Sequence, residues 1–359
     1  MSNAVNSPAA QRVSETARIP WIDAAKGLGI LLIFFGHVFS VAKPTPLYVY
    51  VYAFHVPLFF FLSGLTLKPD AESLGRVLTK KLRTLVVPYL YYAFLGYLFY
   101  LVGYLMAQRL NLHIAQFDYG LWPPLWGILY GSIGDGNLVN GPLWFVMALF
   151  CCFMLGWVIN RYVASLALRL LLVALLAAAG IGLAPVYRLP WSLSPALVAL
   201  VFFQAGYLYQ NSSFFKTLKP GTQWGLLGLA LLTSLFSQLN GFVTLAETRI
   251  GQPPLYFFFA FAGIAMLVLA LQRLGEHGRW LAWLGQYSLS IMLIHMLIIK
   301  SAKVGLAGLL AQSVSAVEES WTLGLIVLGL SAVLLVPAVW FMERFLPFTL
   351  GKRGKRAGS

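Results

Sequence analysis

Residues 22–42 read IDAAKGLGILLIFFGHVFSVA, an apolar run with charged side chains only near its beginning. A helix of this length crosses the roughly 30 Å hydrocarbon core of a bilayer. Similar runs recur along the chain, and we predict membrane-spanning helices at 22–42, 47–67, 84–106, 142–160, 163–184, 192–210, 221–241, 253–272, 282–300 and 321–342. The expected fold class is therefore an all-α integral membrane protein with about ten transmembrane helices.

The composition supports this fold class. Of the 359 residues, 60% are apolar and only 10% are charged, whereas a soluble domain carries roughly a quarter charged residues. An ordinary soluble enzyme is therefore excluded. The two cysteines, Cys151 and Cys152, are adjacent within an apolar run, so we expect neither a disulfide framework nor a metal site.

The net charge of +14 does not indicate a nucleic-acid partner. The Lys and Arg residues recur in small clusters between the apolar runs, as the positive-inside bias of membrane proteins produces. Most of these clusters fall on one side of the membrane, which predicts that both termini are cytoplasmic. We expect a disordered tail at 1–20, a single transmembrane domain at 21–343 and a basic tail at 344–359.

Three of the five histidines, His37, His55 and His295, lie within predicted spans. Ionisable groups inside a membrane are costly and usually face a cavity or a partner. Counting about 1.5 Å per residue from the span ends puts all three in the outer half of the membrane. Each imidazole alone is explained as well by a bond to a nearby carbonyl, but the shared depth on three helices favours a functional site.

Lys26 and His37 are 11 residues apart, almost three turns of helix, so they share one face and are separated by about 16 Å along it. Lys26 is expected at the cytoplasmic rim. A basic loop precedes the third predicted span and contains Arg76, Lys80, Lys81 and Arg83. Arg and Lys are natural ligands of phosphate groups, although topology signalling or contact with anionic lipid explains this cluster as well.

Pro57 lies within the second predicted span, two residues after His55. A proline inside a helix removes a backbone donor and frees a carbonyl. We therefore expect the helix to open locally near His55. Among catalytic motifs, no Walker loop, HExxH or GxSxG element occurs, so ATP-driven transport, zinc chemistry and serine hydrolysis have no support.

Residues 21–30, WIDAAKGLGI, followed by Phe35-Gly36-His37, resemble the opening of the membrane-bound acyltransferase-3 superfamily. The resemblance continues through 55–64, HVPLFFFLSG, and through looser blocks at Arg83 with Pro88-Tyr89, at Pro142-Leu143-Trp144-Phe145 and from Tyr287 to His295. Within the superfamily, the chain is similar to sugar O-acetylases related to fucose 4-O-acetylase and to exopolysaccharide acetyltransferases.

This resemblance implies a multi-pass enzyme of the bacterial inner membrane, embedded in membrane lipid. Such an enzyme takes an acyl group, usually acetyl, from cytoplasmic acyl-CoA and transfers it to a hydroxyl of an extracytoplasmic or lipid-linked glycan. Acyl-CoA is then a donor substrate, not a permanently bound cofactor. The family's basic-x10-His element corresponds to Lys26 and His37; many members carry arginine where this chain has lysine, which keeps the charge without the planar fork.

Together these arguments predict two groups of site residues. The CoA phosphates are expected to contact Lys26, Lys80, Lys81 and Arg83, and the acceptor sugar is expected to contact His37, His55, Asn140, Trp144 and His295. We expect His37 to be the general base that activates the hydroxyl; a covalent acyl-His37 intermediate remains open. His55 would bind the oxyanion or orient the sugar, and Trp144 would stack on the sugar or belong to the aromatic belt.

A transporter or flippase for a lipid-linked sugar or small polar solute is the alternative function. It also requires polar groups at membrane depth. It predicts paired ionisable residues near the midplane and often two matching halves, whereas this chain has a histidine-rich set and no internal repeat. A membrane scaffold or sensor would not need three histidines at one depth. The residues therefore favour an acyltransferase.

Overall fold

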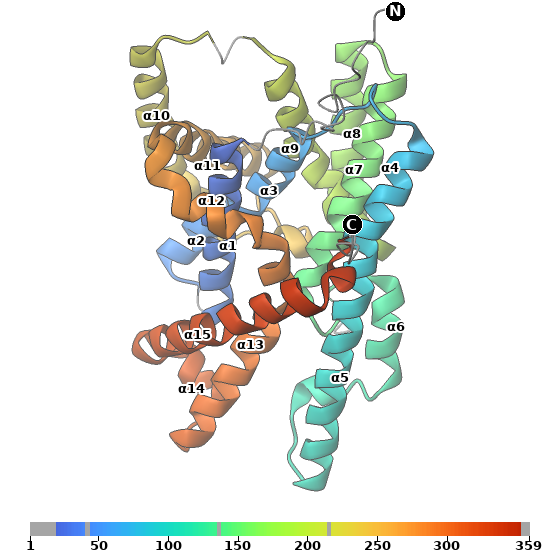
Figure 1. The fold of residues 1–359 in the computed structure, drawn as a ribbon, viewed down its shortest axis with the longest axis vertical. Coiled ribbons are helices and arrows are strands. Elements are labelled where there is room, and N and C mark those ends of the chain that lie inside the picture. Colours follow the sequence, from blue (N-terminus) through green and yellow to red (C-terminus); the bar gives the residue numbers. More distant parts are fainter. Residues whose placement is uncertain (1–18, 40–43, 135–137, 214–216, 353–359) are drawn as a thin grey trace, which may run out of the picture.

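The computed structural model describes residues 19–39, 44–134, 138–213 and 217–352, and these residues are almost entirely helical (Figure 1). Most of the predicted N-terminal tail and the last part of the predicted basic tail lie outside the described residues. Within the described part, β-type pairing is limited to an isolated bridge between Thr244 and Arg249.

The helices follow one another along the chain as α1 (Pro20–Val38), α2 (Pro46–Tyr52), α3 (His55–Gly64), α4 (Leu74–Lys81), α5 (Val87–Arg109), α6 (Trp122–Tyr130), α7 (Trp144–Tyr162), α8 (Leu166–Leu183), α9 (Leu193–Asn211), α10 (Pro220–Leu235), α11 (Pro253–Leu274), α12 (Arg279–Gln286), α13 (Ser288–Leu309), α14 (Val314–Glu319) and α15 (Trp321–Phe345). By length and composition, the described residues contain nine helical segments that can cross a membrane. The protein is therefore an all-α, multi-pass membrane protein, as predicted.

The predicted span 221–241 forms a shorter helix than expected. Helix α10 has 16 residues and is followed by a 3-10 segment, Phe236–Asn240. Ser and Asn side chains compete for backbone hydrogen bonds and disfavour a continuing α-helix. Gln238 in this segment donates to the Pro46 carbonyl at 2.7 Å, so the polar end of α10 is tied to α2 while the helix itself packs along α11.

The second span is built from two helices, and the break lies next to His55, as predicted. It falls at Ala53 and Phe54, between α2 and α3, so that His55 is the first residue of α3. Pro57 lies in the first turn of α3, where backbone N–H groups have no partner within the helix and a proline costs little. The predicted opening of the helix near His55 is therefore confirmed.

Two predicted boundaries were wrong. The basic segment expected as a loop before residue 84 is helical, because α4 continues through π-helical Leu82–Val86 into α5. The predicted span 282–300 is divided at Tyr287, where α12 ends and α13 begins. Helix α13 extends to Leu309, so Lys303 lies within the helix, where it is buried.

Close helix crossings at glycine pairs fix the centre of the bundle. A Cβ atom on Gly27 of α1 or on Gly285 of α12 would collide with a carbonyl of the facing helix, and the same holds for Gly64 of α3 and Gly206 of α9. Small residues permit such approach where helices cross inside a membrane. The first of these crossings holds the N-terminal half of α1 against α12.

Candidate active site

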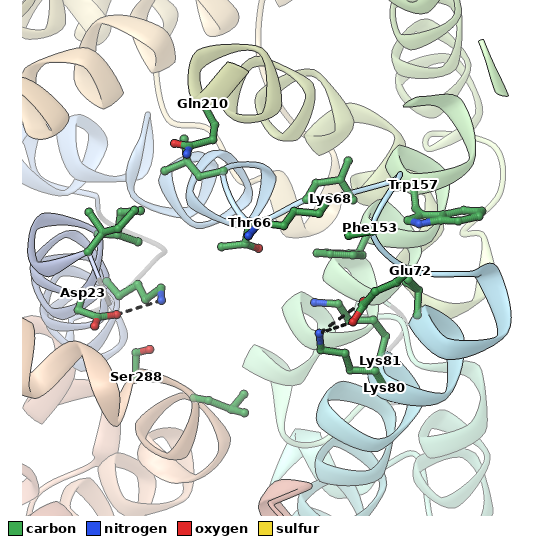
Figure 2. Close-up of a pocket in the computed structure, with 18 of the residues that line it drawn as sticks. Asp23, Thr66, Lys68, Glu72, Lys80, Lys81, Phe153, Trp157, Gln210 and Ser288 are labelled. Carbon is green, nitrogen blue, oxygen red and sulfur yellow. Dashed lines mark hydrogen bonds and ion pairs between the residues drawn. The ribbon is translucent and has the colours of Figure 1, made fainter. Parts of the chain in front are cut away.

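A cleft of about 770 Å³ opens at the Lys26 end of α1. Its lining comes from α1, the segment after α3, α4, α7, α9 and the junction between α12 and α13. The polar residues of the lining are Asp23, Lys26, Thr66, Lys68, Glu72, Lys80, Lys81, Gln210, Gln286 and Ser288. Figure 2 shows Asp23 and Ser288 on one side of the cleft and Lys80, Lys81 and Phe153 on the opposite side.

The cleft carries four ammonium groups and two carboxylates. The carboxylates pair with two of the lysines: Lys26 Nζ lies 3.1 Å from Asp23 Oδ1, and Lys80 Nζ lies 3.1 Å from Glu72 Oε1. Lys81 Nζ instead lies 3.4 Å from the centre of the Phe153 ring. The excess of positive charge suits a ligand with several phosphate groups.

Three of the four residues predicted to hold the phosphates, Lys26, Lys80 and Lys81, line this cleft. The fourth, Arg83, is not among its lining residues; it lies exposed in the π-helical turn, and its backbone carbonyl packs against Gly351. Lys68 lines the cleft in its place. The sequence placed Lys68 in the same basic segment, but only the fold decides which of these cations face inward.

The predicted histidines gather at the other end of α1. The ring centres of His37 on α1 and His295 on α13 lie 5.1 Å apart. His55 of α3 lies within electrostatic range of His37, and its ring centre is 4.6 Å from that of Tyr52. His55 and His295 are buried, and His37 is half-buried.

Hydrogen bonds determine the neutral tautomers of two of these rings. His55 Nδ1 lies 2.8 Å from the Val51 carbonyl, and His295 Nδ1 lies 3.0 Å from the carbonyls of both Ile291 and Met292. Because a carbonyl only accepts, Nδ1 carries the proton and Nε2 keeps its lone pair. Among the described residues, His295 Nε2 is buried and has no hydrogen-bond partner, which is rare in folded proteins. It is therefore an unused acceptor beside His37.

Asn140 and Trp144, which are also predicted to contact the acceptor, have different surroundings. Asn140 is buried and its Nδ2 donates to the Leu293 carbonyl at 2.9 Å, so it reaches α13 two residues before His295. Its Oδ1 is buried with no partner within the described structure. Trp144 is buried in the core, edge-on to Phe145, so its ring face is not open to a ligand.

The cleft and the histidine cluster lie at opposite ends of one face of α1. Lys26 and His37 are about 16 Å apart along the helix. Ile30 and Ile33 lie between them on that face and are both buried. Neither group of residues resembles a metal centre: over the ranges that the structure describes, no three His, Cys, Asp or Glu side chains are arranged to hold a metal ion.

The fold and the cleft define a multi-pass helical membrane protein with a lysine-lined cleft beside its first helix. More particularly, residues 19–342 match the family described as acyltransferase domain, the acyltransferase-3 family. The match covers most of the chain, so the chain belongs to this family of membrane-bound acyltransferases. Neither the curated proteins nor the solved structures contain a match to it.

Proposed function

We propose that this acyltransferase moves an acetyl group from cytoplasmic acetyl-CoA to a hydroxyl of an envelope or exopolysaccharide sugar in the bacterial inner membrane. The observation that carries the proposal is the position of the cationic cleft and the histidine cluster at the two ends of one face of α1. The resemblance of residues 21–37 and 55–64 to sugar O-acetylases supports a glycan as the acceptor.

The cleft suits the CoA part of the donor. Its volume of about 770 Å³ falls in the range of roughly 300–1,000 Å³ that small-molecule sites occupy. The lysines offer charge-assisted hydrogen bonds to the CoA phosphates, and Lys26 and Lys80 would exchange their carboxylate partners for phosphate. The pantetheine arm would then extend along α1 toward His37, past Ile30 and Ile33.

His37 would act as the general base. It takes the proton of the sugar hydroxyl while the oxygen attacks the thioester carbonyl. The new C–O bond forms, the C–S bond breaks, and the proton passes from His37 to the departing CoA sulfur. His295 Nε2, an acceptor without a partner in the described residues, would receive the other ring N–H of His37 and orient it.

The tautomer of His55 distinguishes the two roles predicted for it. With its proton on Nδ1 and bonded to Val51, neutral His55 presents only an acceptor at Nε2. An oxyanion needs a donor, whereas a sugar hydroxyl donates to an acceptor. The hydrogen bonding therefore favours His55 as a residue that orients the sugar.

The test uses the purified protein in lipid nanodiscs with radiolabelled acetyl-CoA and the host's envelope glycan fraction. We expect label in the glycan with wild-type protein and none with His37→Ala, while acetyl-CoA binding is unchanged. His113→Ala is the matched control, because this histidine is 82% exposed and lies in the loop after α5. If the glycan stays unlabelled and the protein, placed in sealed vesicles, moves the glycan across their membrane, the protein is a transporter.

A further inference from the structure

We infer that Lys303 is a positioning residue for His37, an inference that rests on the proposed function of His37. Lys303 lies on α13, about two turns beyond His295, and is only 6% exposed. Its Nζ donates to the His37 backbone carbonyl at 3.2 Å and lies 2.8 Å from Glu318 Oε1. The contact joins the residue predicted to be the base to the helix that carries His295.

The buried ammonium group caps the end of α1. This helix ends at Val38, so the His37 carbonyl is one of its last four carbonyls. These carbonyls accept no hydrogen bond from an N–H group of the same helix. A cation at this position is also favoured by the negative end of the helix dipole. Lys303 therefore stabilises the backbone at the residue whose ring lies 5.1 Å from His295.

Glu318 completes the contact. It lies on α14, which packs against both α13 and α15 (Figure 1), and its carboxylate balances a charge that would otherwise be costly to bury. Removing one partner of a buried ion pair leaves the other uncompensated. The three-part contact of His37, Lys303 and Glu318 thus ties α1, α13 and α14 together at the histidine cluster.

This arrangement predicts an effect on turnover without an effect on donor binding. A displacement of about 1 Å at a reacting group can lower a rate roughly 100-fold. Lys303 lies at the histidine end of α1, whereas the proposed CoA cleft lies at the Lys26 end. Lys303→Met should therefore lower kcat by about 10- to 100-fold and leave the KM for acetyl-CoA unchanged.

The experiment compares Lys303→Met, Lys303→Arg and Glu318→Gln with the control Lys219→Met in nanodiscs. Lys219 is exposed directly before α10 and is neither among the residues that line the cleft nor among those that act electrostatically on His37. Two quantities are measured: acetyl-transfer kinetics, and the rate at which diethyl pyrocarbonate modifies His37, followed by peptide mass spectrometry. We expect Lys303→Met to lower kcat and to change the rate of His37 modification at least threefold, Lys303→Arg to keep both near their wild-type values, and Lys219→Met to match wild type.

Wild-type kcat and wild-type His37 modification in Lys303→Met would overturn the inference. A loss of activity accompanied by a higher KM for acetyl-CoA and a lower thermal stability would also overturn it, because these changes indicate general unfolding. If Lys303→Met does not fold, the same two quantities are measured on Glu318→Gln, which keeps the side-chain shape and removes the charge that pairs with Lys303. If wild type transfers no acetyl group, the proposed function fails, but the His37 modification rates still test the contact.

Discussion

The rings of His37 on the first helix and His295 on α13 have their centres 5.1 Å apart and their planes tilted by 41°. His37 is half-buried, whereas His295 is buried and keeps an Nε2 lone pair without a partner in the described part of the chain. The pair has the arrangement of a base and a second base that orients it.

His295→Ala should lower kcat about 10-fold, because His37 loses the acceptor that would hold its ring. His37→Ala should lower kcat by roughly 10²–10⁴-fold, the usual contribution of a general base. The double variant should be no slower than His37→Ala alone, since residues that act as a unit are not additive. Single-turnover transfer rates measure all three; additive losses would separate the two histidines.

Lys26→Gln should weaken acetyl-CoA binding about 10-fold, because the cleft loses one of its four ammonium groups. Lys26→Arg should retain most of the affinity, since the charge is kept. Arg83→Gln is the matched control, because Arg83 is exposed and is not among the residues that line the cleft. Calorimetric titration in detergent gives the Kd; equal weakening by Arg83→Gln would move the CoA site away from the cleft.

Glu72→Gln should strengthen acetyl-CoA binding by about threefold. The Glu72 carboxylate pairs with Lys80 at 3.1 Å and would compete with a phosphate for the same ammonium group. The gain should shrink as salt is raised, because exposed charges are screened. Weaker binding in this variant at low salt would show that Glu72 contacts the ligand itself.

Gly285→Ala should destabilise the protein by about 1–3 kcal/mol, the usual cost of overpacking, because its Cβ would collide with the Asp23 carbonyl of α1. Gly225→Ala, on α10, is the control: a Cβ there meets nothing within 4 Å, and alanine favours a helix. Thermal unfolding in detergent compares them. A Tm for Gly285→Ala at or above that of the control would contradict the close crossing of α1 and α12.

The predicted orientation puts Asp70 in the cytoplasm and His113 outside. Both side chains are 82% exposed, so single cysteines at these positions should react with a membrane-impermeant maleimide in opposite ways. In intact cells we expect His113→Cys to be labelled and Asp70→Cys to be labelled only after lysis. The background lacks Cys151 and Cys152. The reverse pattern would invert the predicted topology.

Several features were predictable because they depend on short stretches of chain. Apolar runs of about 20 residues specify spanning helices by length alone, and helical periodicity alone puts Lys26 and His37 on one face. The exceptions were boundaries. At Tyr287 and before residue 84, local rules gave the wrong helix ends, because a short turn and a π-helical segment both leave the apolar pattern intact.

The sequence by itself determined the class of the fold, most of the spanning helices and the three histidines that lie within them. Tertiary structure alone decided which of these residues meet. The cleft brings Lys26, Lys68 and Lys80 to one space from separate segments, while Arg83 remains outside. Lys303 reaches the His37 carbonyl across 266 positions of sequence. The physical reason is that partition into a bilayer depends on each helix separately, whereas contacts between helices depend on packing, here on crossings that only glycines permit.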